Sequence, residues 1–283
     1  MITRCKPVLA ILIACGVLSL APQPAAADDA PPRDQEIAAL RAEVAGLRHM
    51  AEAGRDRGEI ENLFSRYMYL HNAFHDPEII ALWVSKGTPD VHAQYSNNGI
   101  YTDWDKVVAY HAQRPNPKGK LTFHYVTTPL IEVAGDGWTA KGLWIMSGVE
   151  SGLTDPQAAK MAPDFMYEKT MIDGKRVWMH TVLVKYGIDF LKQDGQWKIW
   201  HFHCFEVARS PHGIGWIPFA AQSENNPFSD DLMYFGENGR PVLMPKPDAP
   251  VTMRNNPYRT DTGQTLDAPP PVPYRTFADT FTY

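Results

Sequence analysis

The spacing of apolar residues first follows a helical period. Residues 34–53 carry apolar side chains every three or four positions, with charged residues between them: Ile37, Leu40, Val44 and Leu47. This pattern predicts an amphipathic helix suited to packing on its own domain or on a twin subunit. Gly54 and Gly58 interrupt the pattern and predict a break, after which a second helix is expected from about residue 59 to residue 70.

Short polar segments then divide the chain into smaller elements. Asp76-Pro77 predicts the start of a helix, because Asp is a good N-cap and Pro fits the first turn. Asn97-Asn98-Gly99 tolerates positive φ and predicts a hairpin within residues 91–101. Residues 104–113 are expected to form a further short helix.

Beyond residue 120 the period changes from 3.6 to 2, which is typical of β-strands. Four long segments rich in β-branched and aromatic residues predict strands: 123–133, 138–150, 177–192 and 196–207. Residues 151–176 interrupt them as an insertion. Helices followed by a run of long antiparallel strands predict an α+β fold with helices on one face of a curved sheet.

The first 27 residues are typical of a signal peptide and predict an exported, periplasmic protein. Arg4 and Lys6 precede an apolar run of about 13 residues, which is shorter than the roughly 20 needed to span a membrane. Leu12-Ile13-Ala14-Cys15 leaves open an alternative, a lipoprotein anchored through Cys15. Removal of residues 1–27 leaves Cys204 as the one cysteine, so no internal disulfide is expected.

The region from residue 209 to residue 283 is rich in proline and keeps many aromatic residues. Disordered tails are poor in aromatics, so this one is expected to wrap the domain or a neighbouring subunit in extended form. The net charge of −5 provides no basic face for nucleic acid and no polybasic patch for anionic lipid.

Residues 36–208 resemble the SnoaL-like branch of the nuclear-transport-factor-2-like (NTF2-like) superfamily. The motifs that carry the resemblance are Glu59-Ile60-x-x-Leu63-Phe64-x-x-Tyr67, Asn98-Gly99-Ile100-Tyr101, His124-x-x-Thr127-x-Pro129 and Asp194-Gly195-Gln196-Trp197. The resemblance implies a cone over residues 58–208, in which a strongly curved antiparallel sheet wraps around N-terminal helices and leaves a blind apolar pocket. It also implies a homodimer, since the family usually packs sheet against sheet.

Histidine and tyrosine side chains are the candidate chemistry of that pocket. Tyr67 and His71 share one helix face, and His124 stands where the resemblance places the catalytic histidine of dehydratase-like members. His–Tyr clusters without a cysteine or serine nucleophile suit proton transfer without a cofactor. The expected catalytic residues are His124, Tyr67, His71 and His203. The expected substrate-binding residues are Tyr101, Tyr186, Trp144 and His201.

Two departures from the family pattern move the expected base from a carboxylate to a histidine. Asn72 stands at about the place of the family's usual acid, and Ile188 replaces another acid beside Asp189. A metal site at His201-x-His203 with Glu206 is a weaker alternative, because no motif supplies its remaining ligands. The other histidines are expected on the surface or in loops: His75, His92, His111, His180 and His212.

The insertion and the Pro-rich tail ending near Tyr274 resemble SnoaL-like lyases acting on lignin-derived diaryl compounds. The expected function is a cofactor-independent lyase that eliminates a γ-hydroxymethyl group as formaldehyde from a small phenolic substrate and leaves a stilbene. Two alternatives stay open. One is a dehydratase or isomerase of a polycyclic or polyketide-like compound, and the other is a non-catalytic module that binds an aromatic ligand.

Overall fold

The structure is a computed structural model, and it describes residues 33–111, 114–222, 233–235, 241–243 and 245–283. The predicted signal peptide and Cys15 lie outside these ranges, as does Gln113 at the end of the fourth predicted helix, so export stays a prediction. The chain divides into two units, residues 1–47 and 48–283. Among the described helices, none combines the length and the apolar character that a membrane crossing requires.

The first helix, α1 (Arg33–Ala73), is continuous, so the predicted break at residues 54–58 is wrong. A glycine costs a helix only about 1 kcal/mol relative to alanine. Charged neighbours favour the helix here, since Arg55 lies 3.6 Å from Glu59 one turn later and Asp56 lies 2.8 Å from Lys192. The four apolar residues between 33 and 47 are exposed within the first unit.

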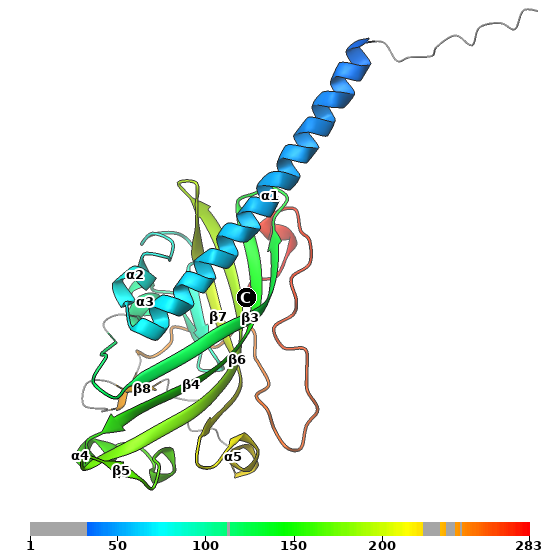
Figure 1. Cartoon of the computed structure of the whole chain (residues 1–283). Helices are drawn as coiled ribbons and strands as arrows, with labels where there is room; N and C mark the ends of the chain where they lie inside the picture. The colour runs from blue at the N-terminus through cyan, green and yellow to red at the C-terminus, as the bar shows by residue number, and fades with distance from the viewer. Residues whose placement is uncertain (1–32, 112–113, 223–232, 236–240, 244) are drawn as a thin grey trace, which may run out of the picture. The chain divides into compact units, whose positions relative to one another are not determined.

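The second unit is built on a mixed sheet in the strand order β2-β1-β7-β6-β4-β3, with β5 paired to β6. The strands of this sheet are β1 (His92–Tyr95), β2 (Ile100–Tyr101), β3 (Leu121–Val133), β4 (Thr139–Thr154), β5 (Met171–Ile172), β6 (Lys175–Gln193) and β7 (Gln196–Pro211). All pairs are antiparallel except β1 with β7. The predicted α+β fold with a curved sheet is confirmed (Figure 1).

Shorter elements connect or follow these strands. They are α2 (Asp76–Ile80), α3 (Trp104–Ala109), α4 (Pro156–Ala159), the 3-10 helix η1 (Asp164–Met166), α5 (Trp216–Gln222), β8 (Met233–Phe235), β9 (Pro241–Leu243) and η3 (Phe277–Asp279). The predicted hairpin forms as β1 and β2, with Ala93 opposite Tyr101. The expected insertion contains α4, η1 and β5, while β4 and β6 run a few residues further into it than predicted.

The main core lies between α1 and the inner face of the sheet. Phe64 packs on Trp144 with ring centroids 4.4 Å apart, and Tyr67 lies 5.6 Å from Phe202. Phe64 and Tyr67 lie about one turn apart on one face of α1, and together with Trp144 of β4 and Phe202 of β7 they are almost completely buried. The last turn of α1 therefore ends against the inner surface of β3, β6 and β7.

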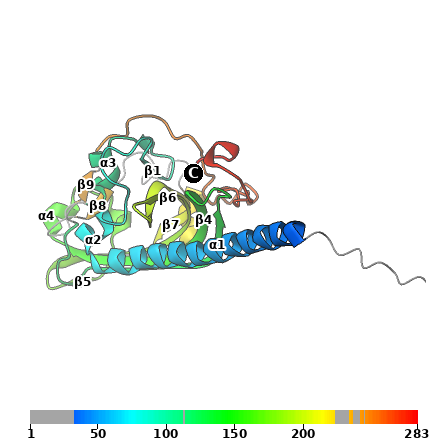
Figure 2. The same cartoon turned by 90° about the horizontal axis from the view of Figure 1, so that it is seen from above.

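Residues 245–283 cover part of the opposite face of the sheet, on the side away from α1 (Figure 2), with contacts to β1, β6 and β7. Tyr283 is fully buried, and its ring packs near Phe205 of β7. Gly187 of β6 is needed beneath it, because a Cβ there would lie 2.4 Å from the Tyr283 ring. The prediction that the aromatic tail wraps the domain in extended form is confirmed for these residues on their own chain.

Candidate active site

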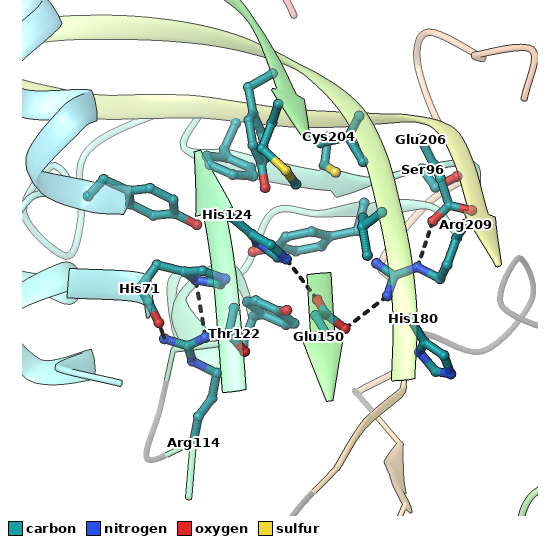
Figure 3. A pocket seen from close by; sticks show the side chains of 18 of the residues that line it. His71, Ser96, Arg114, Thr122, His124, Glu150, His180, Cys204, Glu206 and Arg209 are labelled. Atoms are coloured by element: carbon teal, nitrogen blue, oxygen red, sulfur yellow. Dashed lines mark hydrogen bonds and ion pairs between the residues drawn. The ribbon is translucent and has the colours of Figure 1, made fainter. Parts of the chain in front are cut away.

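Four neighbouring strands bring polar side chains to one end of the inner face. His124 of β3 lies opposite Gly148 of β4, and Glu150 lies opposite His180 of β6. Arg209 of β7 lies opposite Val182 on the same face. Because side chains alternate along a strand, this register places the charged and polar groups on the cavity side. Together with the last turn of α1 they line one cavity (Figure 3).

A chain of ion pairs runs across the sheet through Glu150. Its Oε1 lies 3.1 Å from Nε2 of His124, and its Oε2 lies 3.2 Å from Nη1 of Arg209. Arg209 Nε lies 3.2 Å from Glu206. Burial raises the pKa of Glu150, but the Arg209 guanidinium and His124 outweigh it and hold that pKa well below its usual value. Glu150 is therefore a carboxylate that orients His124.

Two further residues fix the position of His124 itself. The Asn72 side chain donates to the His124 carbonyl at 2.7 Å and accepts from the His124 amide at 3.0 Å. Gly148 makes room for the ring, since a Cβ there would lie 2.3 Å from Cδ2 of His124. Both the backbone and the imidazole of His124 are therefore held in one place.

His71 at the end of α1 is held by an arginine. Arg114 donates from Nη1 to Nδ1 of His71 at 3.1 Å, and its Nη2 lies 2.6 Å from Asp76. Burial, followed by the charge of Arg114, lowers the pKa of His71 well below its usual value. A neutral His71 that accepts at Nδ1 carries its proton on Nε2, so it acts as a hydrogen-bond donor. Its ring stacks on His124 with centroids 5.2 Å apart.

Tyr67 forms a buried pair with His111, whose Nε2 lies 3.0 Å from the Tyr67 hydroxyl. Burial raises the pKa of Tyr67 and lowers that of His111, so both groups are neutral. His111 is completely buried, and His180 and His92 are nearly so. The prediction that His92 and His180 lie on the surface or in loops is wrong, because both are buried strand residues, whereas His111 does lie in a turn but is buried there.

The rest of the cavity is mainly aromatic and aliphatic. It opens to solvent, and the free space within it and its mouth together comes to about 1120 Å³. The apolar walls come from the middle of the inner face of the sheet: Met146, Trp178, Val182, Val184, Tyr186 and Phe202. Charged groups at one end and flat apolar walls in the middle suit a small aromatic ligand.

Residues 52–203 match the model of the SnoaL-like domain. The chain belongs to the SnoaL-like family. Its architecture is similar to a proposed scytalone dehydratase of Novosphingobium aromaticivorans, at 16% identity over 59% of this chain and 94% of that one, with a TM-score of 0.41. It is also similar to the hexachlorocyclohexane dehydrochlorinase LinA-type3 of Novosphingobium barchaimii, at 15% identity over 59% and 98% of the two chains, with a TM-score of 0.40. Curated proteins give no match.

The cavity of this SnoaL-like protein contains Tyr67, His71, His124 and Tyr186, so the structure brings four of the predicted site residues together. The other four do not line it. Trp144 is buried in the core beside Phe64, and Tyr101 lies behind Tyr95 at 6.0 Å between ring centroids. His201 and His203 lie on the opposite face of the sheet.

A β-bulge explains why the two strand histidines face away from the cavity. Asp189 pairs with His201 while Phe190 pairs with Ile199, so Trp200 is an extra residue in β7. The extra residue reverses the alternation after Ile199, and His201 instead binds Asp189 at 2.8 Å beneath the tail. Glu206 faces the cavity, so the alternative metal site at His201, His203 and Glu206 is wrong. Within the described residues, no group of three or more His, Cys, Asp or Glu could hold a metal ion.

Sequence reasoning missed Glu150, Arg114 and Arg209. Glu150 has a recognisable signal, because it follows Met146 and Gly148 at every second position and so extends the inner face of its strand. A charge at an inward position of a strand usually has a partner. Arg114 follows the loop after α3, and the sequence contains no pattern that places it beside His71.

Proposed function

We propose that this SnoaL-like protein is a cofactor-independent lyase in which His124 transfers the proton. The observation that carries the proposal is the 3.1 Å contact between His124 and Glu150 inside the cavity. A carboxylate that holds one imidazole nitrogen fixes the tautomer and supports a positive charge on the ring. The other nitrogen then serves as a base and afterwards as an acid.

The proposed substrate is a phenolic diaryl compound of the lignin-derived class, a diarylpropane diol. His124 removes the proton of the terminal hydroxyl, whose carbon becomes formaldehyde as the carbon–carbon bond breaks. The electron pair of that bond forms the new double bond and expels the benzylic hydroxyl, which takes up a proton and leaves as water. Diol therefore yields stilbene, formaldehyde and water, with no net oxidation or reduction.

The remaining polar groups are suited to holding the substrate oxygens. Arg114 and the Nε2–H of His71 can donate hydrogen bonds to a phenolic oxygen, and Tyr67, which is paired with His111 behind it, also lines the cavity. Tyr186 and Phe202 offer flat faces for the rings. Such positioning would favour one orientation of a two-ring compound.

The test incubates chelator-treated protein with diarylpropane diols and follows formaldehyde and stilbene absorbance together. We expect both products in equal amounts, and a loss of about 100-fold or more in rate for His124→Ala and Glu150→Gln. His75→Gln, at an exposed position, is the matched control and should react like the unchanged protein. Loss of water from the diol without formaldehyde would contradict the lyase and indicate a dehydratase. Binding of the diol without any reaction would indicate a non-catalytic binding module.

Homodimer formation is a further part of the proposal. The outer face of β3 and β4 exposes an apolar row, in which Phe123 lies opposite Val149 and Thr127 lies opposite Ile145. Exposed patches of this kind are typical of protein interfaces. Light scattering should give twice the chain mass for the unchanged protein and a monomer for Phe123→Glu, while Leu266→Glu in the exposed tail should stay dimeric. A monomeric unchanged protein would contradict this part.

A further inference from the structure

The end of β1 and the turn that follows it present two side chains with buried polar atoms to the cavity. Tyr95 and Asn98 both line it. Neither the Tyr95 hydroxyl nor either end of the Asn98 amide has a hydrogen-bond partner among the described residues. Tyr95 is only 6% exposed. Buried polar groups are almost always satisfied, and leaving one unpaired costs about 1–3 kcal/mol, so these groups are poised for a ligand.

This turn is held rigidly from outside by the C-terminal tail. Asn97 and Asn255 exchange two hydrogen bonds of 2.9 and 3.1 Å, and Ile100 donates to the Ala249 carbonyl at 2.9 Å. Ser96 has a φ of +55°, which is costly for a residue with a Cβ. The tail contacts lie beyond the residues matched by the SnoaL-like model, which ends at residue 203. The extension thus stabilises a strained turn at the cavity wall.

The turn and the proton-transfer group occupy different parts of the same wall. Ring contacts run from Tyr95 to Tyr110 at 5.2 Å, from Tyr110 to His71 at 6.2 Å and from His71 to His124 at 5.2 Å between centroids. Phe202 also lies 5.8 Å from Tyr95. An aromatic ring bound beside the turn would therefore pack against aromatic side chains while another part of the molecule reaches His124.

We propose that Tyr95 and Asn98 form a second subsite, which binds the oxygen substituents of one aromatic ring of the substrate, away from the bond that breaks. The inference rests on the proposed function and adds the substrate feature that this site recognises. A phenol and a carboxamide together offer donors and acceptors without charge. Neighbouring hydroxyl and ether oxygens on one ring match them, since the hydroxyl can donate and both oxygens can accept.

The experiment measures binding by calorimetry to His124→Ala protein, so that turnover does not interfere. The probes are a diarylpropane diol with hydroxyl and methoxyl groups on both rings and two analogues, each with one ring unsubstituted. We expect one analogue to bind about tenfold more weakly, as expected for one or two lost hydrogen bonds in a buried site. Adding Tyr95→Phe and Asn98→Leu should abolish that difference, whereas adding Tyr69→Phe at an exposed position should preserve it.

A second variant tests whether the tail's hydrogen bonds to the turn matter for binding, and it changes no residue that lines the cavity. Asn97→Ala removes the exchange with Asn255 and should reduce the same preference while the protein stays folded by circular dichroism. It also replaces the double variant if that one fails to fold. An unchanged preference in these variants, or no binding of any probe, would overturn the subsite.

The subsite and the lyase can fail separately. If the affinity difference between the probes depends on Tyr95 and Asn98 but the protein without substitutions releases no formaldehyde, the subsite is supported and the lyase proposal is contradicted. If formaldehyde is released at equal rates from all three probes, the lyase proposal is supported and the subsite is contradicted.

Discussion

At the scale of single residues, the carboxylate of this site comes from another position than the one that the resemblance predicts. Asn72 stands where the resemblance expects an acid, and it holds the backbone of His124 through one donated and one accepted hydrogen bond. The acid beside the His124 ring is instead Glu150, on the adjacent strand. The departure that shifted the expected base to a histidine is therefore consistent with this histidine having a carboxylate partner from elsewhere.

Restoring an acid at position 72 should impair the site. An Asn72→Asp carboxylate cannot donate to the His124 carbonyl, and it would place two acceptors together in a half-buried position. We expect the unfolding free energy to fall by about 1–3 kcal/mol and the rate of the proposed lyase reaction to fall by about tenfold or more. Urea unfolding and initial rates measure the two effects. Asn62→Asp, at an exposed position of α1, is the control, and equal behaviour of the two variants would contradict the role of Asn72.

At the scale of elements, periodicity predicted more of the fold than of the site. Every long strand was predicted to within a few residues, and Tyr67, His71 and His124 were placed correctly because helix and strand periods fix which residues share a face. His201 and His203 were misplaced because one extra residue, Trp200, reverses the alternation, and nothing in the local sequence marks a bulge. Arg114 was missed because its contact with His71 spans 43 positions.

The two glycines of α1 give a prediction at this scale. Gly54 and Gly58 lie inside a continuous helix, and a Cβ added at either would meet no atom within 4 Å. Gly54→Ala and Gly58→Ala should therefore each stabilise the protein, by about 0.5–1 kcal/mol, because alanine loses less backbone entropy on folding. Thermal unfolding measures the gain. Gly148→Ala is the opposite control, since its Cβ would collide with His124, and destabilisation by the helix substitutions would argue for a break at these glycines.

At the scale of the whole molecule, the sheet separates two polar networks that the sequence does not distinguish. The inner face carries His124, Glu150 and Arg209 around the cavity, while the outer face buries Lys141, Asp189 and His201 beneath the tail. Burial raises the pKa of Asp189, but His201 and Lys141 outweigh it and lower that pKa, so the outer group is a closed ionic cluster. Each network therefore joins a histidine to a carboxylate and a cation on its own side of the sheet.

The pH dependence of unfolding follows from two other buried histidines, His180 and His203. Burial, followed by Arg209, lowers the pKa of His180 to about 4, and burial, followed by His92, lowers that of His203 to about 3. The usual value is 6.5. Between these limits the unfolded chain binds protons that the folded protein does not, so stability falls as the pH drops below 6.5. Each such histidine should contribute a loss of about 1.4 kcal/mol per pH unit, or roughly 2 kcal/mol at about pH 5.

Urea unfolding at a series of pH values between about 5 and 8 measures this slope. His180→Gln should flatten it, because an uncharged side chain of similar polarity removes one proton from the difference between the two states. His75→Gln, at an exposed position, should leave the slope as it is. A slope that does not change in His180→Gln would mean that this histidine charges while folded. Its ring would then have to accept a proton beside the positively charged Arg209 guanidinium, which opposes a second positive charge there.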